Sequence, residues 1–182
     1  KSSVVKFDAD AFAAGTSLQL PVYIDAARRM LEEQRLLPAG GYYMRIGDKY
    51  HESKEQAEKD ARMSGISLAD AQVLRDFSAV LDGNSFVAVD QAVTASGGLN
   101  ARGAARLFLA DELAGLLLST RAMIGEAAAR IWGGDTAIAP AGEEACSFCD
   151  YKGICRVNPE YAGNTPRTLQ PFDRADLSGV GI

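Results

Sequence analysis

The segment from Cys146 to Arg156 reads CSFCDYKGICR and holds all three cysteines of the chain. Thiolates at C-x2-C-x5-C spacing can converge on one metal if the backbone turns tightly, and Gly153 lowers the cost of such a turn. Zinc sites and iron–sulfur clusters each take four ligands, so this segment lacks one. We therefore expect Cys146, Cys149 and Cys155 to form an incomplete metal site whose metal the spacing does not identify.

Other states of these cysteines stay open on spacing alone. The three thiols could be reduced and buried, or Cys146 and Cys149 could form a disulfide that leaves Cys155 unpaired. The chain's single histidine, His51, lies nearly a hundred residues away in a charged stretch. We do not expect His51 to be the missing ligand.

Length and composition predict one globular domain. The chain has 182 residues, of which 47% are apolar and 24% are charged. The most apolar window, Leu107 to Ile131, is interrupted by charged residues, and the N-terminus has no apolar signal region. We expect no membrane association and a reducing, cytoplasmic location, where paired cysteines more often bind metal or act in catalysis than form disulfides.

The charge balance limits the ways in which the chain can bind nucleic acid. Its formal net charge is −5, whereas domains that hold nucleic acid by bulk electrostatics usually carry a basic excess or a basic face. Any contact with nucleic acid should therefore be local.

The first third of the sequence predicts a strand, a helix and a second strand. The strand covers Val4–Phe7, the helix runs from an N-cap at Ser17 to about Leu36, and the second strand covers Tyr42–Ile46. Gln19 and Tyr23 are four residues apart, so both project from one side of this helix. Beside them runs a stripe that we expect to be buried: Leu20, Ile24, Ala27 and Leu31.

The rest of the chain continues this alternation. Lys49–Ala61 is highly charged and predicts an exposed helix or a mobile segment, and Phe86–Val93 predicts a strand. Helical periodicity is clearest in Leu68–Leu81 and in Arg106–Trp132, where we expect Phe108 and Trp132 to pack in the core.

Several stretches, taken in order, resemble a known family over nearly the whole chain. After Lys1-Ser2-Ser3 they are GTSLQLPVY at Gly15–Tyr23, AGGYYMRI at Ala39–Ile46, MSGISLADAQVL at Met63–Leu74, GGDTAIAP at Gly133–Pro140 and CSFCDYKGICRVNP at Cys146–Pro159. They are similar to the C-terminal nuclease domain of AddB, the helicase-like and nuclease subunit of bacterial AddAB recombination-repair complexes. That nuclease is similar to RecB within the PD-(D/E)XK superfamily.

The resemblance implies an α/β fold. We expect the PD-(D/E)XK core, a mixed sheet flanked by helices, here truncated at its N-terminus so that the first strands are missing. Residues 1–145 would be the C-terminal portion of the nuclease core. Residues 146–182 would be an iron–sulfur segment and tail of the same domain.

The resemblance also assigns roles to single residues. Lys1 matches the lysine that ends the catalytic Asp-x-Lys motif, and Gln19 and Tyr23 match the Q-x3-Y motif on the following helix. The three cysteines, Cys146, Cys149 and Cys155, match C-terminal ligands of a [4Fe–4S] cluster, whose fourth cysteine lies far upstream in the family and is absent from this chain.

The family's magnesium ligands are also expected upstream of Lys1. Hydrolysis of a phosphodiester by this family needs carboxylates that hold Mg²⁺, which lowers the pKa of the attacking water, and a lysine cannot replace those ligands. Asp8 and Asp10 lie in a predicted loop beyond the strand, and we do not expect them or Asp25 to substitute.

Two functions of different classes follow. The first is part of a Mg²⁺-dependent exonuclease that degrades single-stranded DNA during double-strand break repair, with an AddA-type helicase–nuclease as partner. The alternative is a non-catalytic structural or DNA-end-binding module with a cysteine clamp around zinc or an iron–sulfur cluster. Because the carboxylates would be missing, we expect the isolated chain to act as such a module.

Overall fold

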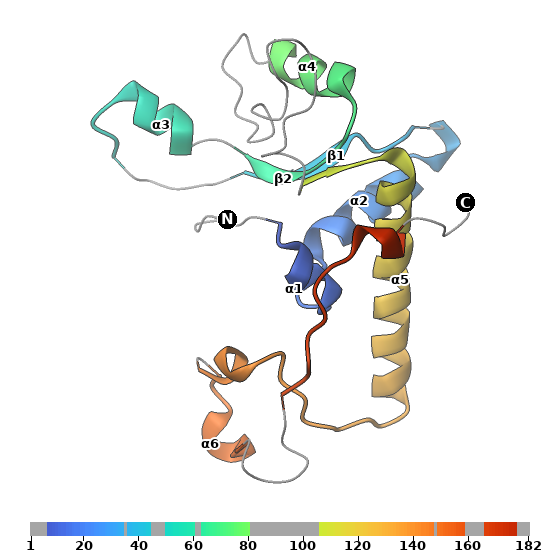
Figure 1. The fold of residues 1–182 in the computed structure, drawn as a ribbon, viewed down its shortest axis with the longest axis vertical. Helices are drawn as coiled ribbons and strands as arrows, with labels where there is room; N and C mark the ends of the chain where they lie inside the picture. Colours follow the sequence, from blue (N-terminus) through green and yellow to red (C-terminus); the bar gives the residue numbers. More distant parts are fainter. Residues whose placement is uncertain are drawn as a thin grey trace.

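A computed structural model describes most of the chain, namely residues 7–34, 36–44, 50–60, 63–80, 106–147, 149–158 and 166–177 (Figure 1). The strand expected at Phe86–Val93 lies outside these residues, and so does the strand expected at Val4–Phe7 except for Phe7 itself. None of the described helices is long and apolar enough to cross a membrane.

The described sheet has three strands and is mixed, as the family resemblance predicts. Strand β2 (Ser64–Leu68) lies in the centre, antiparallel to β1 (Gly40–Tyr43) and parallel to β3 (Leu107–Phe108). In the register, Gly41 lies opposite Ile66 and Tyr43 lies opposite Ser64. Residues opposite each other in an antiparallel pair point to the same face of the sheet, and side chains alternate along a strand, so both of these pairs lie on one face and the pair Tyr42–Gly65 lies on the other.

Helices cover both faces of the sheet (Figure 1). The helices α1 (Ala9–Ala13), α2 (Gln19–Met30) and α5 (Ala110–Trp132) lie on one face, and α4 (Ala71–Val80) lies on the other. The main core lies between the sheet and the first group and contains Phe7, Phe12, Leu20, Ile24, Ile66, Phe108, Leu113, Leu116, Leu117 and Leu177.

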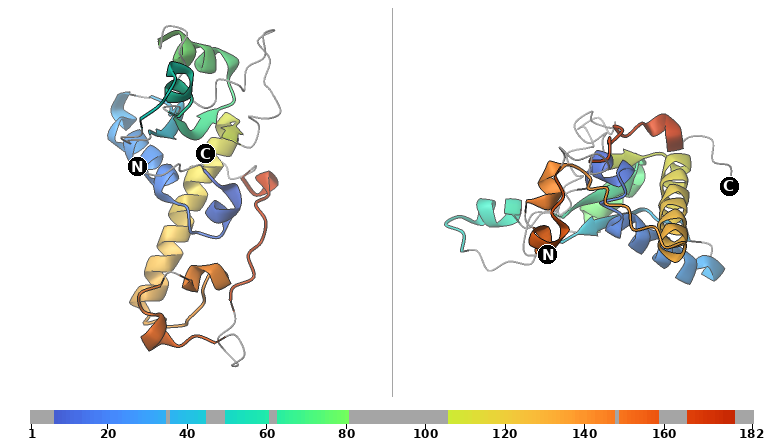
Figure 2. Two further views of the ribbon diagram at one scale, coloured as in Figure 1. Left: turned by 90° about the vertical axis from the view of Figure 1, so that its left-hand side faces the viewer. Right: turned by 90° about the horizontal axis from the view of Figure 1, so that it is seen from below.

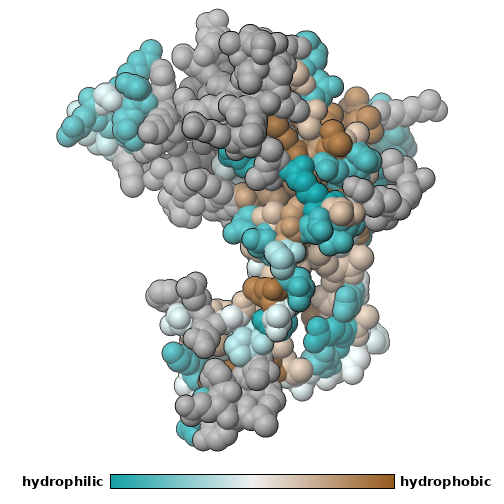
Figure 3. Space-filling model, viewed as in Figure 1, coloured by the Kyte–Doolittle hydropathy of each residue, from teal (hydrophilic) through white to brown (hydrophobic). Residues whose placement is uncertain are grey.

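The hydrophobic core on the face covered by α4 is smaller. Leu74 of α4 packs there against Leu107, and Tyr42 is partly buried beside them. Asp70 begins the helix, because its Oδ1 accepts hydrogen bonds from the backbone N–H groups of Gln72 and Val73 at 2.7 and 3.0 Å. Polar residues over α3 (Lys54–Asp60) and apolar residues where the sheet meets α5 stand out in Figure 3.

The C-terminal part of the chain leaves this core and returns to it. After α5 it passes through η4 (Glu143–Cys146) and α6 (Lys152–Cys155), at the end of the molecule away from the sheet (Figures 1 and 2). The chain then runs back to η5 (Arg174–Leu177), which packs on the first turns of α5.

The first expected helix begins and ends differently in the structure. The helix expected from Ser17 to about Leu36 is α2, which ends at Met30 and has Leu18 as N-cap without a side-chain hydrogen bond. Leu20 and Ile24 of the expected stripe are buried, whereas Ala27 and Leu31 are exposed. The prediction of a buried stripe is therefore confirmed for two of its four residues, because α2 packs on the sheet through its first half.

The longest helix also differs from expectation. It begins at Ala110, because Leu107 and Phe108 form β3 instead of a first turn. Phe108 is fully buried as expected, but Trp132 is 94% exposed, so its assignment to the core was wrong. The last turns of α5 extend beyond the sheet, where none of the described core residues meets them.

Candidate functional site

Gln19 and Tyr23 form a polar pair at the start of α2. The side-chain amide of Gln19 donates a hydrogen bond to the Tyr23 hydroxyl at 3.2 Å. Both side chains are solvent-accessible, with Tyr23 60% exposed, while Leu20 and Ile24 on the same helix are buried. The helix thus uses one side to pack on the sheet and presents the predicted Q-x3-Y pair on another.

Tyr43 of β1 reaches the same end of α2, which the sequence did not indicate. Burial raises the pKa of the Tyr43 phenol, a hydrogen bond with the backbone of Leu20 lowers it in part, and the neighbouring Tyr23 raises it slightly. Opposite Tyr43, Ser64 is buried, and its hydroxyl has no hydrogen-bond partner within the described part of the chain. Polar groups from α2, β1 and β2 therefore gather on one side of the sheet.

Asp25 holds the same helix to α5. Its carboxylate accepts two hydrogen bonds from Arg121, one of them from Nε at 2.8 Å, and it also lies near Arg28 and Arg29. The Arg121 guanidinium keeps the pKa of Asp25 below its ordinary value, although burial opposes this effect. A carboxylate whose two oxygens are held by an arginine is not available as a metal ligand.

The other two aspartates considered as metal ligands also have structural roles. Asp8 is the N-cap of α1, where its Oδ1 accepts a hydrogen bond from the N–H of Ala11 at 3.0 Å. Asp10 accepts one from the backbone N–H of Phe172 at 2.8 Å and so ties the C-terminal return to α1. The loop expected at Asp8 and Asp10 is therefore wrong, because this stretch begins helix α1, and both carboxylates have structural roles there.

The catalytic lysine expected from the sequence, Lys1, lies outside the described residues. Within the described residues, no group of three or more histidine, cysteine or acidic side chains is arranged to hold a metal ion. These residues therefore do not by themselves fit a magnesium site, and no catalytic step can be derived from them through Mg²⁺.

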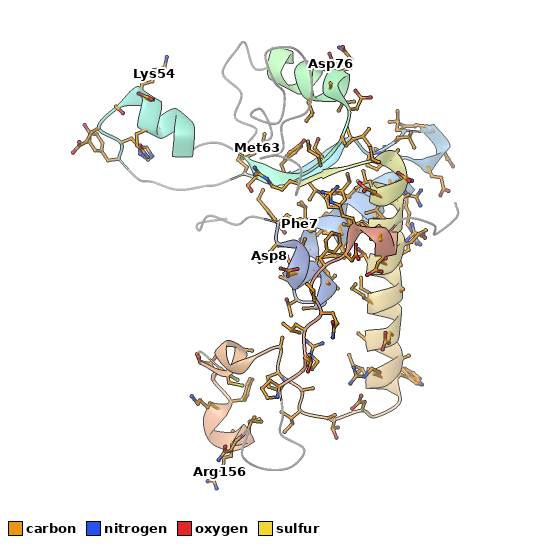
Figure 4. The ribbon with its side chains drawn as sticks, viewed as in Figure 1. Phe7, Asp8, Lys54, Met63, Asp76 and Arg156 are labelled. Carbon is orange, nitrogen blue, oxygen red and sulfur yellow. The ribbon has the colours of Figure 1, made fainter. Side chains whose placement is uncertain are left out.

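The cysteines lie in a series of short turns around α6. The N–H of Cys149 donates to the carbonyl of Cys146 at 3.4 Å, and the N–H of Cys155 donates to the carbonyl of Tyr151 at 2.8 Å. Arg156, with a left-handed φ of 49°, ends α6 at the lower end of the view in Figure 4. The tight turns that a C-x2-C-x5-C site needs are therefore present.

Thiols are the ligands that an iron–sulfur cluster requires, but these three are not positioned to bind one cluster in this structure. All three are free of disulfides; Cys146 is half-buried and Cys149 and Cys155 are exposed, so both the disulfide and the buried-thiol alternatives are wrong for this structure. The three are not gathered around one point. His51 lies three residues before α3 in the sequence, and Figure 1 shows α3 far from α6.

The fold and this arrangement agree with the comparisons to known proteins. The sequence profile of the PD-(D/E)XK nuclease superfamily matches residues 1–156, so the chain belongs to this superfamily. The family expected from the sequence motifs is thereby confirmed.

Curated relatives make the comparison more specific. The chain is similar to proteins that are named as one subunit of an ATP-dependent helicase/deoxyribonuclease. The one from Thermoanaerobacter sp. (strain X514) is 25% identical over 82% of this chain and 14% of its own length. Those from Carboxydothermus hydrogenoformans and Pelotomaculum thermopropionicum are 27% and 30% identical, over 100% and 90% of this chain and 18% and 15% of their own lengths. The chain thus spans less than a fifth of these relatives.

Proposed function

We propose that this chain forms part of a Mg²⁺-dependent exonuclease domain that degrades single-stranded DNA in the cytoplasm during double-strand break repair by homologous recombination. Its membership of the nuclease superfamily and the names of its relatives support this proposal. An AddA-type helicase–nuclease would be the partner in the complex. In this proposal Lys1 orients the attacking water, and Gln19 and Tyr23 act beside it.

The observation that carries the proposal is the Gln19–Tyr23 pair at the start of α2. Its amide and phenol can exchange hydrogen bonds with phosphate or base edges, and the ring of Tyr23 offers a surface on which an unpaired base can stack. Such a contact needs no basic face, which suits a chain with a net charge of −5.

Two inorganic cofactors belong to the proposal. When bound, Mg²⁺ would activate water and neutralise phosphate charge, and its ligands would come from residues other than those described. Cys146, Cys149 and Cys155 would supply three ligands of a [4Fe–4S] cluster. The turns around α6 support this ligand set, although the thiols would have to move together to bind one cluster.

A DNA degradation assay tests the proposal. End-labelled single-stranded and double-stranded DNA are incubated with the full-length protein in Mg²⁺, with and without EDTA. We expect progressive shortening of the single strand that EDTA abolishes. Absence of shortening, or shortening that EDTA does not affect, would contradict the proposal.

The second candidate function is a DNA-end-binding module without catalysis. The exposure of Tyr23 favours it as well, because stacking on a base requires no metal. Binding of the single strand that persists in EDTA, without shortening in Mg²⁺, is the result that would favour this candidate over a nuclease.

A further inference from the structure

The two adjacent tyrosines of β1 point to opposite faces of the sheet. Tyr42 lies on the α4 side, where its hydroxyl donates to the Oγ of Ser67 at 2.8 Å. Because side chains alternate along a strand, Gly41 and Tyr43 point to the other face. Tyr43 packs there against the main core, together with Leu20 of α2. Tyr42 and Tyr43 are therefore two chemically identical side chains in different surroundings.

The strand approaches α2 closely beside Tyr43. A Cβ atom at Gly41 would lie 2.7 Å from Cγ1 of Ile24 and 3.2 Å from Cδ1 of Leu20, so a larger residue there would displace the side chains of these two α2 residues. Tyr43, two residues further along β1, lies at the first turn of α2. A hydrogen bond between its hydroxyl and the backbone of Leu20, the residue after Gln19, places this hydroxyl at the first turn of α2.

We propose that Tyr43 is a positioning residue that holds the first turn of α2 and the Tyr23 side chain in the orientation needed to contact single-stranded DNA. The chain of contacts runs from the Tyr43 hydroxyl to the backbone of Leu20, which follows Gln19 in the first turn of α2, and from the Gln19 amide to the Tyr23 hydroxyl. Phenylalanine at position 43 would keep the packing but lose the hydroxyl. This inference rests on the proposed function, because it concerns the same contact with DNA.

The test compares Tyr43→Phe with Tyr42→Phe in the full-length protein. The readouts are kcat, KM for single-stranded DNA and the thermal midpoint. Tyr43→Phe should raise KM about threefold to tenfold, the range for loss of one hydrogen bond, and should lower the thermal midpoint less than Tyr42→Phe does, because the Tyr43 phenol is the less buried of the two. Tyr42→Phe should lower the midpoint, because Ser67 loses a partner, and leave KM within about twofold.

A double-mutant cycle separates positioning from a direct effect on DNA. If Tyr43 acts through Tyr23, Tyr43→Phe should change KM by less than about twofold when Tyr23→Phe is already present. A full and additive effect in that background would overturn the proposal, and so would equal effects of Tyr42→Phe and Tyr43→Phe on KM.

Variants of the Q-x3-Y pair show which claim has failed. If Gln19→Ala and Tyr23→Phe both raise KM while Tyr43→Phe does not, the inference about Tyr43 is wrong and the proposed function stands. If none of the three variants changes kcat or KM, the assigned role of the pair in the proposed function is wrong, and the inference fails with it.

Discussion

At the scale of single residues, Asp25 links the candidate site to the rest of the molecule. It lies two positions after Tyr23, on the helix that carries the Q-x3-Y pair, and binds Arg121 of α5. Asp25 is largely buried, and two hydrogen bonds to a charged donor offset part of its cost of desolvation. The ion pair therefore limits how far the middle of α2 can shift against α5.

Replacing Asp25 by asparagine should weaken the fold in a pH-dependent way. At neutral pH we expect the free energy of unfolding to fall by about 1–3 kcal/mol, because Arg121 loses its charged partner. Because folding lowers the pKa of Asp25 below 3.8, its contribution is complete above that pH and is lost as the pH falls through the folded-state pKa. The difference between wild type and variant should therefore shrink in acid.

Denaturant unfolding at several pH values measures this difference. Asp135→Asn is the matched control, because Asp135 also pairs with an arginine, Arg130, but at an exposed site. We expect the control to change stability little. A difference for Asp25→Asn that stays constant down to low pH would show that the carboxylate does not titrate as its contacts imply.

Sequence reasoning predicts the local part of this site and misses the rest. The Gln19–Tyr23 contact follows from helical spacing and from the family motif, since the residues are four apart. Arg121 is 96 residues from Asp25, and Tyr43 meets α2 only because β1 packs on that helix. Without the tertiary arrangement, no periodicity in the sequence predicts these two contacts.

At the scale of elements, glycines determine how closely helices and strands approach one another. Gly115 lies on the side of α5 that meets η5, where an added Cβ would collide with the carbonyl oxygen of Leu177. Arg174 of η5 strengthens this contact by donating to the carbonyl of Leu107 at 2.7 Å and to Glu112 at 3.1 Å. The C-terminal return is thus fixed against the first turns of α5.

Two glycines of the same helix give a matched pair of variants. Gly115→Ala should lower the free energy of unfolding by about 1–3 kcal/mol, because η5 must move away from α5. At Gly125 an added Cβ meets no heavy atom within 4 Å, so Gly125→Ala should raise it by up to about 1 kcal/mol through helix propensity. Chemical denaturation distinguishes them, and equal effects would contradict the packing described for η5.

The sequence predicted some of the helices and strands but not the central strand. The stretch Ser64–Leu68 forms the central strand β2, although the sequence favoured no strand there, because two serines and a glycine have little preference for strands. Gly65 is nevertheless required, since an added Cβ would collide with the carbonyl oxygen of Gly41 on β1. Tertiary packing rather than local propensity therefore determines this strand.

At the scale of the whole molecule, the cysteine segment lies apart from the sheet, while the chain on both sides of it is attached to the core. It follows α5 on one side, and on the other side Phe172 donates a hydrogen bond to Asp10 of α1 and Arg174 donates one to Glu112 at the start of α5. A cluster would therefore hold together a part of the molecule in which none of the described residues from 133 to 158 belongs to the main core. This arrangement supports our proposal that residues 146–182 belong to the same domain as the nuclease core.

Spectroscopy of anaerobically purified full-length protein tests the cluster. We expect a broad visible absorption band from thiolate-to-iron charge transfer, together with bound iron and sulfide, and loss of the band in Cys149→Ser. Ser147→Ala, which removes a nearby hydroxyl and no thiol, should keep it. A colourless protein with stoichiometric zinc would show that the three thiols bind zinc instead.

The central claim is that the start of α2 forms part of a metal-dependent nuclease site. Degradation of labelled single-stranded DNA by full-length Gln19→Ala and Tyr23→Phe tests it most directly, with Tyr50→Phe as control because Tyr50 is 91% exposed and precedes α3. We expect the first two variants to lose about tenfold or more in kcat/KM, corresponding to at least about 1.4 kcal/mol of transition-state stabilisation, while Tyr50→Phe retains wild-type activity. Wild-type rates in both Gln19→Ala and Tyr23→Phe would contradict the claim.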